Sequence, residues 1–495
     1  MKKFISTLLI CSLIVSLSGC NSSKNTESAT SETTQATTTT EATTTAEPTT
    51  EATTEETTTE TTWTDPVETD KIIVIECPSN YSNEYFQLFL ELHPDFGYEF
   101  EFIEPQVVDY ETPFKGSTAD IIFVPGQSMI PDNDWMKHTD ELMPYERVFD
   151  DLDSKLEDAG IPQAVVAAGR LNEDSPLYTL SVESSVQMFV YRKSVAQDVF
   201  GTDDPEQISE IIGGGSGNYV KFYEAGNKLK ESGYFMSARS VDVFNPLVRA
   251  NISNWIDMGN GTIQMTDSDY DLVNDVFSFG SECTNDPVVN SGSQYDFNEA
   301  WYGDKIFGFN GNMIDVSMTL QMNGQKAELN KDLGFCEAPV TTCSPGNTHY
   351  YVNKNTEHRK AIAEVLNWFF FDCSETGLPS LLFNGDERIQ AFGIPIATKV
   401  FENSDLNFRT LEIGQNYQTK TKTLKDVKIY PWIASLMKKA APVYYEDEMN
   451  YTNVVWRAIL STLSDIYGTT SDYSINNTKD LFKQHLKESV EEQSV

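Results

Sequence analysis

Three groups of residues are of a type that could take part in catalysis or bind a metal. They are the histidines, a serine within a glycine run and two acidic clusters. The five histidines form no HExxH zinc pair. Ser216 lies in a glycine run, but a GxSxG nucleophile turn needs glycine where Asn218 stands. The acidic runs 150–158 and 267–271 lack the glycine that a calcium loop requires. No GxxxxGK[ST] phosphate loop occurs. We therefore predict no metal, no cofactor and no catalytic residue.

Carboxylates leave one enzymatic alternative open. A glycosidase needs only two carboxylates about 5–10 Å apart, and the chain has 75 acidic residues. Aromatic residues make up 12% of the chain, with 22 Tyr and 7 Trp. Aromatic rings beside carboxylates and amides suit a neutral polar ligand such as a sugar, although core packing explains many of them equally well.

Cys20 is the residue with the clearest predicted modification. Met1, Lys2 and Lys3 supply a positive start, and residues 4–17 form an apolar segment too short to span a bilayer. Leu17-Ser18-Gly19-Cys20 then resembles a bacterial lipobox. We predict a lipoprotein signal peptide at 1–19, a lipid on Cys20, and a mature chain anchored to the outer face of the bacterial cell membrane.

Residues 20–70 have the composition of a tether. Twenty-two of the residues in 21–70 are threonine, and serine, alanine and glutamate supply much of the rest. Such a segment buries too little apolar surface to offset its ordering entropy. We therefore predict a disordered spacer with a reach of roughly 40 Å, which leaves residues 71–495 to fold.

The charge balance excludes one class of partner. The chain has 35 basic and 75 acidic residues, a net charge of −40. Nucleic-acid binding depends on Lys and Arg neutralising phosphates, so we predict no nucleic-acid partner. The same charge argues against electrostatic docking on anionic lipid.

Hydrophobic patterning predicts the elements that must position a site. The apolar runs 71–77 and 119–125 are typical of buried strands, and 81–92 between them has helical spacing. This strand–helix–strand order indicates an α/β domain. Residues 213–217 predict a flexible break, and 357–371 predicts an amphipathic helix.

Several motifs occur in an order that resembles a known family. The segment from Tyr178 to Ala196, continuing through 201–206, is similar to the first crossover of extracellular solute-binding proteins of ABC importers. Further segments match the carbohydrate-binding group of that family, which includes maltose-binding protein; they are 297–311, 333–339, 350–355 and 393–395. The group often has a tryptophan after the glycine that corresponds to Gly311, and Asn312 stands there instead.

The resemblance implies a two-lobed α/β fold of the periplasmic-binding-protein type (type II), with hinge crossovers and a ligand cleft. We expect lobe 1 to comprise about 71–180 and 348–390, and lobe 2 about 181–347 and 391–495. The implied function is a monomeric receptor that captures a sugar or oligosaccharide and delivers it to an ABC permease. Two alternatives are a surface adhesin or sensor with the same fold and a glycan-degrading enzyme.

Candidate ligand-binding residues are those at predicted strand ends, crossovers and turns that would face such a cleft. Carboxylates and amides there would bind hydroxyl groups, and aromatic rings would stack on the sugar. The candidates are Ser79, Asn80, Tyr81, Gln127, Ser128, Glu183, Asp242, Asn245, Trp255, Trp301, Asn310 and Asn312. Of the five cysteines after residue 70, Cys336 and Cys343 are close enough in sequence to close a small loop, and at least one cysteine must be unpaired within the chain.

Overall fold

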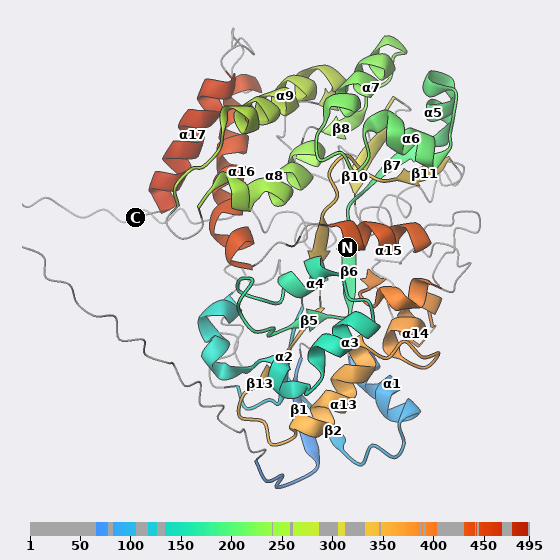
Figure 1. Cartoon of the computed structure of the whole chain (residues 1–495), viewed down its shortest axis with the longest axis vertical. Helices are drawn as coiled ribbons and strands as arrows, with labels where there is room; N and C mark the ends of the chain where they lie inside the picture. Colours follow the sequence, from blue (N-terminus) through green and yellow to red (C-terminus); the bar gives the residue numbers. More distant parts are fainter. Residues whose placement is uncertain are drawn as a thin grey trace, which may run out of the picture.

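The computed structural model places two lobes one above the other (Figure 1). It describes residues 66–77, 83–104, 117–125, 134–239, 241–257, 261–286, 305–311, 332–345, 348–386, 388–389, 393–402, 430–440, 442, 445–467 and 478–493. The chain has the α/β character that the sequence predicts.

The first lobe is built around a six-stranded sheet that joins two distant parts of the chain. Its strands are β1 (Ile72–Glu76), β2 (Glu99–Ile103), β3 (Ile121–Pro125), β4 (Leu142–Met143), β5 (Leu180–Ser181) and β13 (Thr348–Asn353). β1 pairs in parallel with β2 and β3, whereas β13 runs antiparallel to β3. Because Thr348 pairs with Pro125, β13 begins at the edge where β1 and β3 end.

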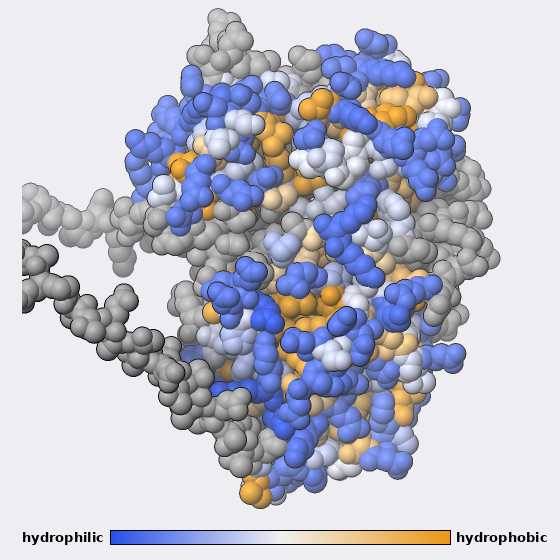
Figure 2. Space-filling view, in the orientation of Figure 1, coloured by the Kyte–Doolittle hydropathy of each residue, from blue (hydrophilic) through white to orange (hydrophobic). Residues whose placement is uncertain are grey.

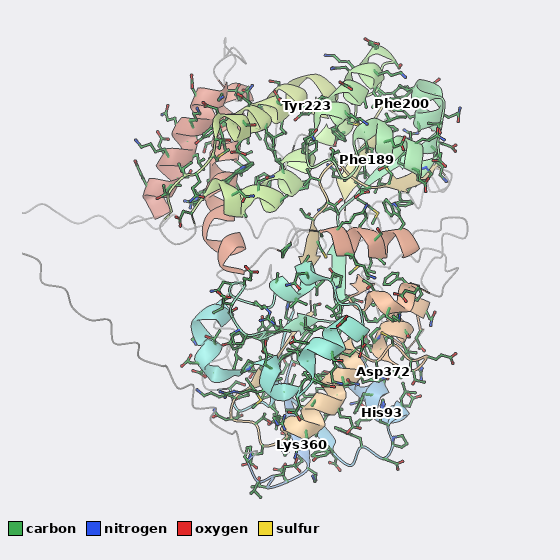
Figure 3. The ribbon with its side chains drawn as sticks, viewed as in Figure 1. His93, Phe189, Phe200, Tyr223, Lys360 and Asp372 are labelled. Atoms are coloured by element: carbon green, nitrogen blue, oxygen red, sulfur yellow. The ribbon has the colours of Figure 1, made fainter. Side chains whose placement is uncertain are left out.

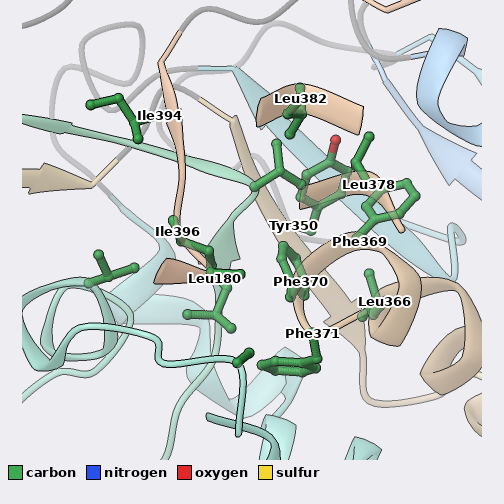
Figure 4. Packing of buried hydrophobic residues seen from close by; sticks show 14 of the residues in the cluster. Leu180, Tyr350, Leu366, Phe369, Phe370, Phe371, Leu378, Leu382, Ile394 and Ile396 are labelled. Atoms are coloured by element: carbon green, nitrogen blue, oxygen red, sulfur yellow. The ribbon is translucent and has the colours of Figure 1, made fainter. Parts of the chain in front are cut away.

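Helices cover this sheet and close the first core. They are α1 (Asn83–Leu92), η2 (Asp134–Glu141), α2 (Tyr145–Val148), α3 (Leu152–Asp158), α4 (Gln163–Ala167), α13 (Arg359–Phe370) and α14 (Leu378–Asn384). The predicted amphipathic helix is confirmed as α13, whose apolar side is fully buried. Its Phe369 ring lies 4.9 Å from that of Phe86 on α1, and Figure 4 shows Phe369, Phe370 and Tyr350 packed together.

The second lobe has its own sheet and its own core. β7 (Met188–Arg192) lies between β10 (Gly308–Gly311) and β11 (Leu333–Cys336), antiparallel to both. A second pair is β8 (Ser237–Arg239) with β9 (Thr284–Asp286). The helices are α5 (Lys193–Phe200), α6 (Pro205–Ile212), α7 (Val220–Glu231), α8 (Val241–Trp255), α9 (Asp267–Cys283), α16 (Tyr445–Tyr467) and α17 (Thr478–Gln493). Phe189, Phe222 and Val273 are among its buried side chains.

A three-stranded sheet connects the lobes. β6 (Glu183–Val186) pairs antiparallel with β12 (Cys343–Pro345) and with β14 (Ile394–Pro395). β6 continues through Gln187 into β7, so one extended strand passes from the first lobe into the second, and the chain returns through β12. This sheet is the hinge between the lobes.

The C-terminal part of the chain is divided between the lobes, whereas we expected all of 391–495 in the second. η4 (Thr398–Phe401) contacts α14, and α15 (Tyr430–Lys439) contacts α4 and β6. α16 and α17 pack on the second lobe, against α8 and α9. The cause is burial: Ile394 and Ile396 are at most 1% exposed in the first core, which holds the following residues on that lobe.

The surface agrees with the acidic composition. Figure 2 shows a face that is largely hydrophilic, with hydrophobic residues in patches on both lobes. Within the described ranges, no helix is both long enough and apolar enough to cross a membrane. Residues 68–70, which we assigned to the tether, lie on the first lobe: Thr69 N–H donates to Glu357 Oε2 at 3.0 Å.

Candidate functional site at the hinge

The extended strand β6–β7 carries polar side chains on one face where it passes between the lobes. Successive side chains of a strand point to opposite faces. Glu183, Ser185 and Gln187 therefore share one face, and Ser184, Val186 and Met188 share the other. Glu183 is 1% exposed and Ser185 is 7% exposed. We call the face of Glu183, Ser185 and Gln187 the polar hinge face.

Two atoms of the polar hinge face have no hydrogen-bond partner among the described residues. They are Ser185 Oγ and Gln187 Oε1, both shielded from solvent. A buried polar atom left unsatisfied costs about 1–3 kcal/mol, so folded chains seldom keep several together. A ligand with hydroxyl groups could satisfy both atoms. The Glu183 carboxylate beside them accepts hydrogen bonds and gives none when ionised.

Asn310 extends the polar hinge face into the second lobe. It lies in β10 directly opposite Phe189 of β7, and directly opposed residues of an antiparallel pair point to the same side. Phe189 is on the same face as Gln187, so Asn310 is too, and it is 9% exposed. Glu183 and Asn310, two predicted site residues 127 positions apart in sequence, thus lie on the same face, with six positions of the extended strand, about 20 Å, between Glu183 and Phe189.

The carboxyl edge of the first-lobe sheet lies on the hinge side. Thr348, at that edge, is three residues after the hinge strand β12. Glu76 ends β1 at the same edge, and burial raises the pKa of its carboxyl group, partly opposed by a 2.7 Å hydrogen bond from Ser117 Oγ. Sequence reasoning missed Glu76, although a carboxylate closing an apolar run was a usable signal.

Trp255 was a wrong prediction. We expected it to offer a stacking face, but it is 0% exposed and lies in the second core at the last turn of α8. An aromatic residue at helical spacing is equally compatible with a core position, and burial of the large indole ring decides between them. Among the tryptophans whose side chains are described, Trp432 on α15 and Trp456 on α16 stay partly exposed. Neither was predicted.

The remaining predicted residues are only partly covered. Asp242 and Asn245 lie in the first two turns of α8, which follows β8, but their side chains are not among those that the structure describes. The residues outside the described ranges are Cys20, Ser79, Asn80, Tyr81, Gln127, Ser128, Trp301 and Asn312. No group of His, Cys, Asp and Glu among the described residues could hold a metal ion.

A hollow on the outer surface of the second lobe was the other candidate. It lies between α5, α6 and α7 and is lined by Phe200, Ile211, Lys221 and Lys228 among others. Figure 3 shows Phe200 near the outer edge of the lobe and Phe189 further inside. The hollow lacks buried polar groups, so the hinge is the better candidate.

Comparison with known proteins bears on the fold. No protein-family model and no curated protein matches the sequence significantly. Solved structures do match. An extracellular solute-binding protein family 1 member from Alicyclobacillus acidocaldarius has a TM-score of 0.56 and 12% identity over 87% of this chain and 100% of its own.

Two sugar-related structures agree with it. An open conformation of a sugar transporter protein from Rhizobium etli has a TM-score of 0.56 at 13% identity, over 84% of this chain and 99% of its own. A cyclo/maltodextrin-binding protein complexed with maltotetraose has a TM-score of 0.53 at 13% identity, over 84% and 97%. The chain has the fold of a type II solute-binding protein. This confirms the predicted two-lobed architecture with hinge crossovers.

Proposed function

We propose that this protein is a membrane-anchored receptor that binds a sugar or oligosaccharide between its lobes and delivers it to an ABC permease. The observation that carries the proposal is the polar hinge face, buried between the two lobes of a solute-binding fold. The maltotetraose bound in one of the similar solved structures supports a carbohydrate. The proposed activity is binding without a chemical step.

The chemistry of the polar hinge face suits a neutral polyhydroxy ligand. Glu183 would accept hydrogen bonds from sugar hydroxyls, and a charged acceptor makes the stronger bonds. Ser185 and Gln187 can both donate and accept. Binding by closure of two lobes over a ligand is a hinge motion, and the hinge sheet lies directly beneath these residues.

The test is a thermal unfolding screen of the full-length protein in detergent. Monosaccharides and oligosaccharides are compared with amino acids and short peptides. A ligand at about 100 times its dissociation constant stabilises the folded state by about 2.7 kcal/mol, which raises Tm measurably. We expect a selective rise with an intact, unhydrolysed glycan. A rise only with peptides or amino acids would overturn the carbohydrate proposal, and hydrolysis of the glycan would overturn the binding-only proposal.

A further inference from the structure

Helix α15 belongs to the first lobe but also contacts the second. Trp432, in its first turn, packs against both hydrophobic cores. Lys439, at its other end, has its Nζ 3.1 Å from Glu337 Oε2, and Glu337 follows β11 of the second lobe. Figure 1 shows α15 lying between the two lobes, close to β6. We call the Lys439–Glu337 ion pair together with Trp432 the α15 clasp.

Glu337 is held firmly on the second lobe. The glycine run 213–217, for which the sequence predicted a flexible break, packs against Glu337 and the residues that follow it. Gly215 N–H donates to Ala338 O at 2.9 Å, and Gly217 N–H donates to Pro339 O at 3.0 Å. Gly215 has a φ of +69°, in the left-handed region that favours glycine, and a Cβ there would lie 2.8 Å from Glu337 Oε1. The Glu337 side chain is 14% exposed, so Lys439 is paired with a fixed anchor.

The α15 clasp lies on the opposite side of the hinge from the polar hinge face. α15 contacts β6, and its buried side chains include Ile433, Leu436 and Met437. These side chains belong to the same hydrophobic core as Val186 and Met188, which lie on the apolar face of the strand. When the lobes close over the polar hinge face, their surfaces on that side of the hinge approach each other. Contacts between the lobes on the opposite side of the hinge then move apart.

We propose that the α15 clasp opposes closure of the lobes and so sets ligand affinity from outside the binding site. Closing the lobes must break the ion pair or strain it. A partly exposed ion pair such as this one, with the Lys439 side chain 57% exposed, changes an equilibrium by about two- to five-fold. The proposal rests on the two-lobed fold and is independent of which ligand binds.

The experiment measures the distance between the lobes without any ligand. Spin labels are attached through unnatural amino acids at the exposed positions Glu364 on α13 and Glu231 on α7 of the full-length protein in detergent. The variant is Lys439→Met, and the matched control is Lys438→Met, an exposed lysine one position away in the same helix. We expect Lys439→Met to raise the ratio of closed to open populations about two- to five-fold, and the control to match the wild type. Equal distributions in all three proteins would overturn the proposal.

Glu337→Gln separates the clasp from an effect of lysine removal alone. It preserves size, so it should reproduce the Lys439→Met distribution, and the double variant should go no further than either single change. Raising the salt concentration should move the wild type in the same direction, because a partly exposed pair is screened. Additive effects of the two substitutions would show independent action and overturn the clasp. Since no sugar is present, failure here is distinct from failure of the proposed function.

Discussion

Ser184 and Ser185 are adjacent in β6 and both are buried, yet they face opposite sides of the strand. Ser184 Oγ lies 3.0 Å from Cys343 Sγ, whereas Ser185 Oγ has no partner in the described chain. The pair therefore allows a matched test of the polar hinge face.

Ser185→Ala should weaken glycan binding about 2- to 10-fold, the value of one net hydrogen bond, and should leave the ligand-free Tm unchanged or slightly higher. Ser184→Ala should leave affinity unchanged, because its hydroxyl points away from the ligand. Calorimetric titration with the glycan that gives the largest thermal shift measures both. Equal losses in the two variants would contradict the assignment of the binding face.

Cys336 and Cys343, which we considered as a disulfide, are both free and buried. Cys336 pairs with Phe189 and Cys343 with Val186 on the same extended strand. Those partners are three positions apart, so the two thiols face opposite sides. Burial raises the pKa of Cys343 to about 11, partly opposed by Ser184.

The native protein should therefore react slowly with iodoacetamide at neutral pH. Cys373, whose pKa burial raises to about 11, is the only partly exposed thiol among the four described as free, so it should be labelled first. Unfolding should speed labelling about a hundredfold or more, as the thiols return to pKa values of about 8.5. Peptide mass mapping measures this, and a linked 336–343 peptide would contradict it.

At the scale of elements, α17 shows how the C-terminal residues attach to the second lobe. The Phe482 ring is buried 6.0 Å from Phe277 of α9. Lys483 Nζ lies 3.1 Å from Asp267 Oδ1 at the start of α9. This hydrogen-bonded lysine, with Lys479 nearby, holds the pKa of the Asp267 carboxyl below its usual value.

Lys483→Met should lower Tm slightly at neutral pH. A carboxyl whose pKa is lower in the folded than in the unfolded state stabilises the fold above the unfolded pKa, and the stabilisation is lost as pH falls through the folded pKa. The difference from the wild type should therefore be complete at neutral pH and should disappear as the pH falls below the lowered folded pKa of Asp267. Lys487→Met is the control, since Lys487 forms its ion pair within α17 itself, with its Nζ 3.8 Å from Glu491 Oε1. A difference that persists in acid would contradict the ion-pair explanation.

At the scale of the whole molecule, sequence predicted more of the fold than of the site. Apolar runs and helical spacing identified β1, β3 and α13, because burial periodicity is local information. Glu183 and Asn310 followed from their positions at a crossover and a strand end. The burial of Trp255 and the packing of α15 on the first lobe depend on contacts between residues far apart in sequence. The glycine run looked flexible for the same reason: its partner, Glu337, lies more than 100 residues away.

The position of the N-terminal segment relates the proposed anchor to the proposed site. Glu68 and Lys71 form an ion pair, both bond to Tyr98, and Asp70 lies 3.3 Å from His358 Nε2. These residues precede β1 and so lie at its amino edge, whereas Glu76 ends β1 at the edge facing the hinge. The residues that follow the predicted tether thus lie at the edge of the first-lobe sheet opposite the edge that faces the hinge and the proposed ligand site.

Cys20→Ser should therefore release the protein from the membrane without changing what it binds. In a bacterial host we expect the variant in the soluble fraction with its lipid mass absent, and Cys11→Ser, a control in the same leader, in the membrane fraction. The glycan-induced rise in Tm should be the same for Cys20→Ser and wild type, because the anchor joins the lobe far from the hinge. Membrane retention of Cys20→Ser would contradict lipid anchoring at this residue, and a lost thermal shift would contradict the separation of anchor and site.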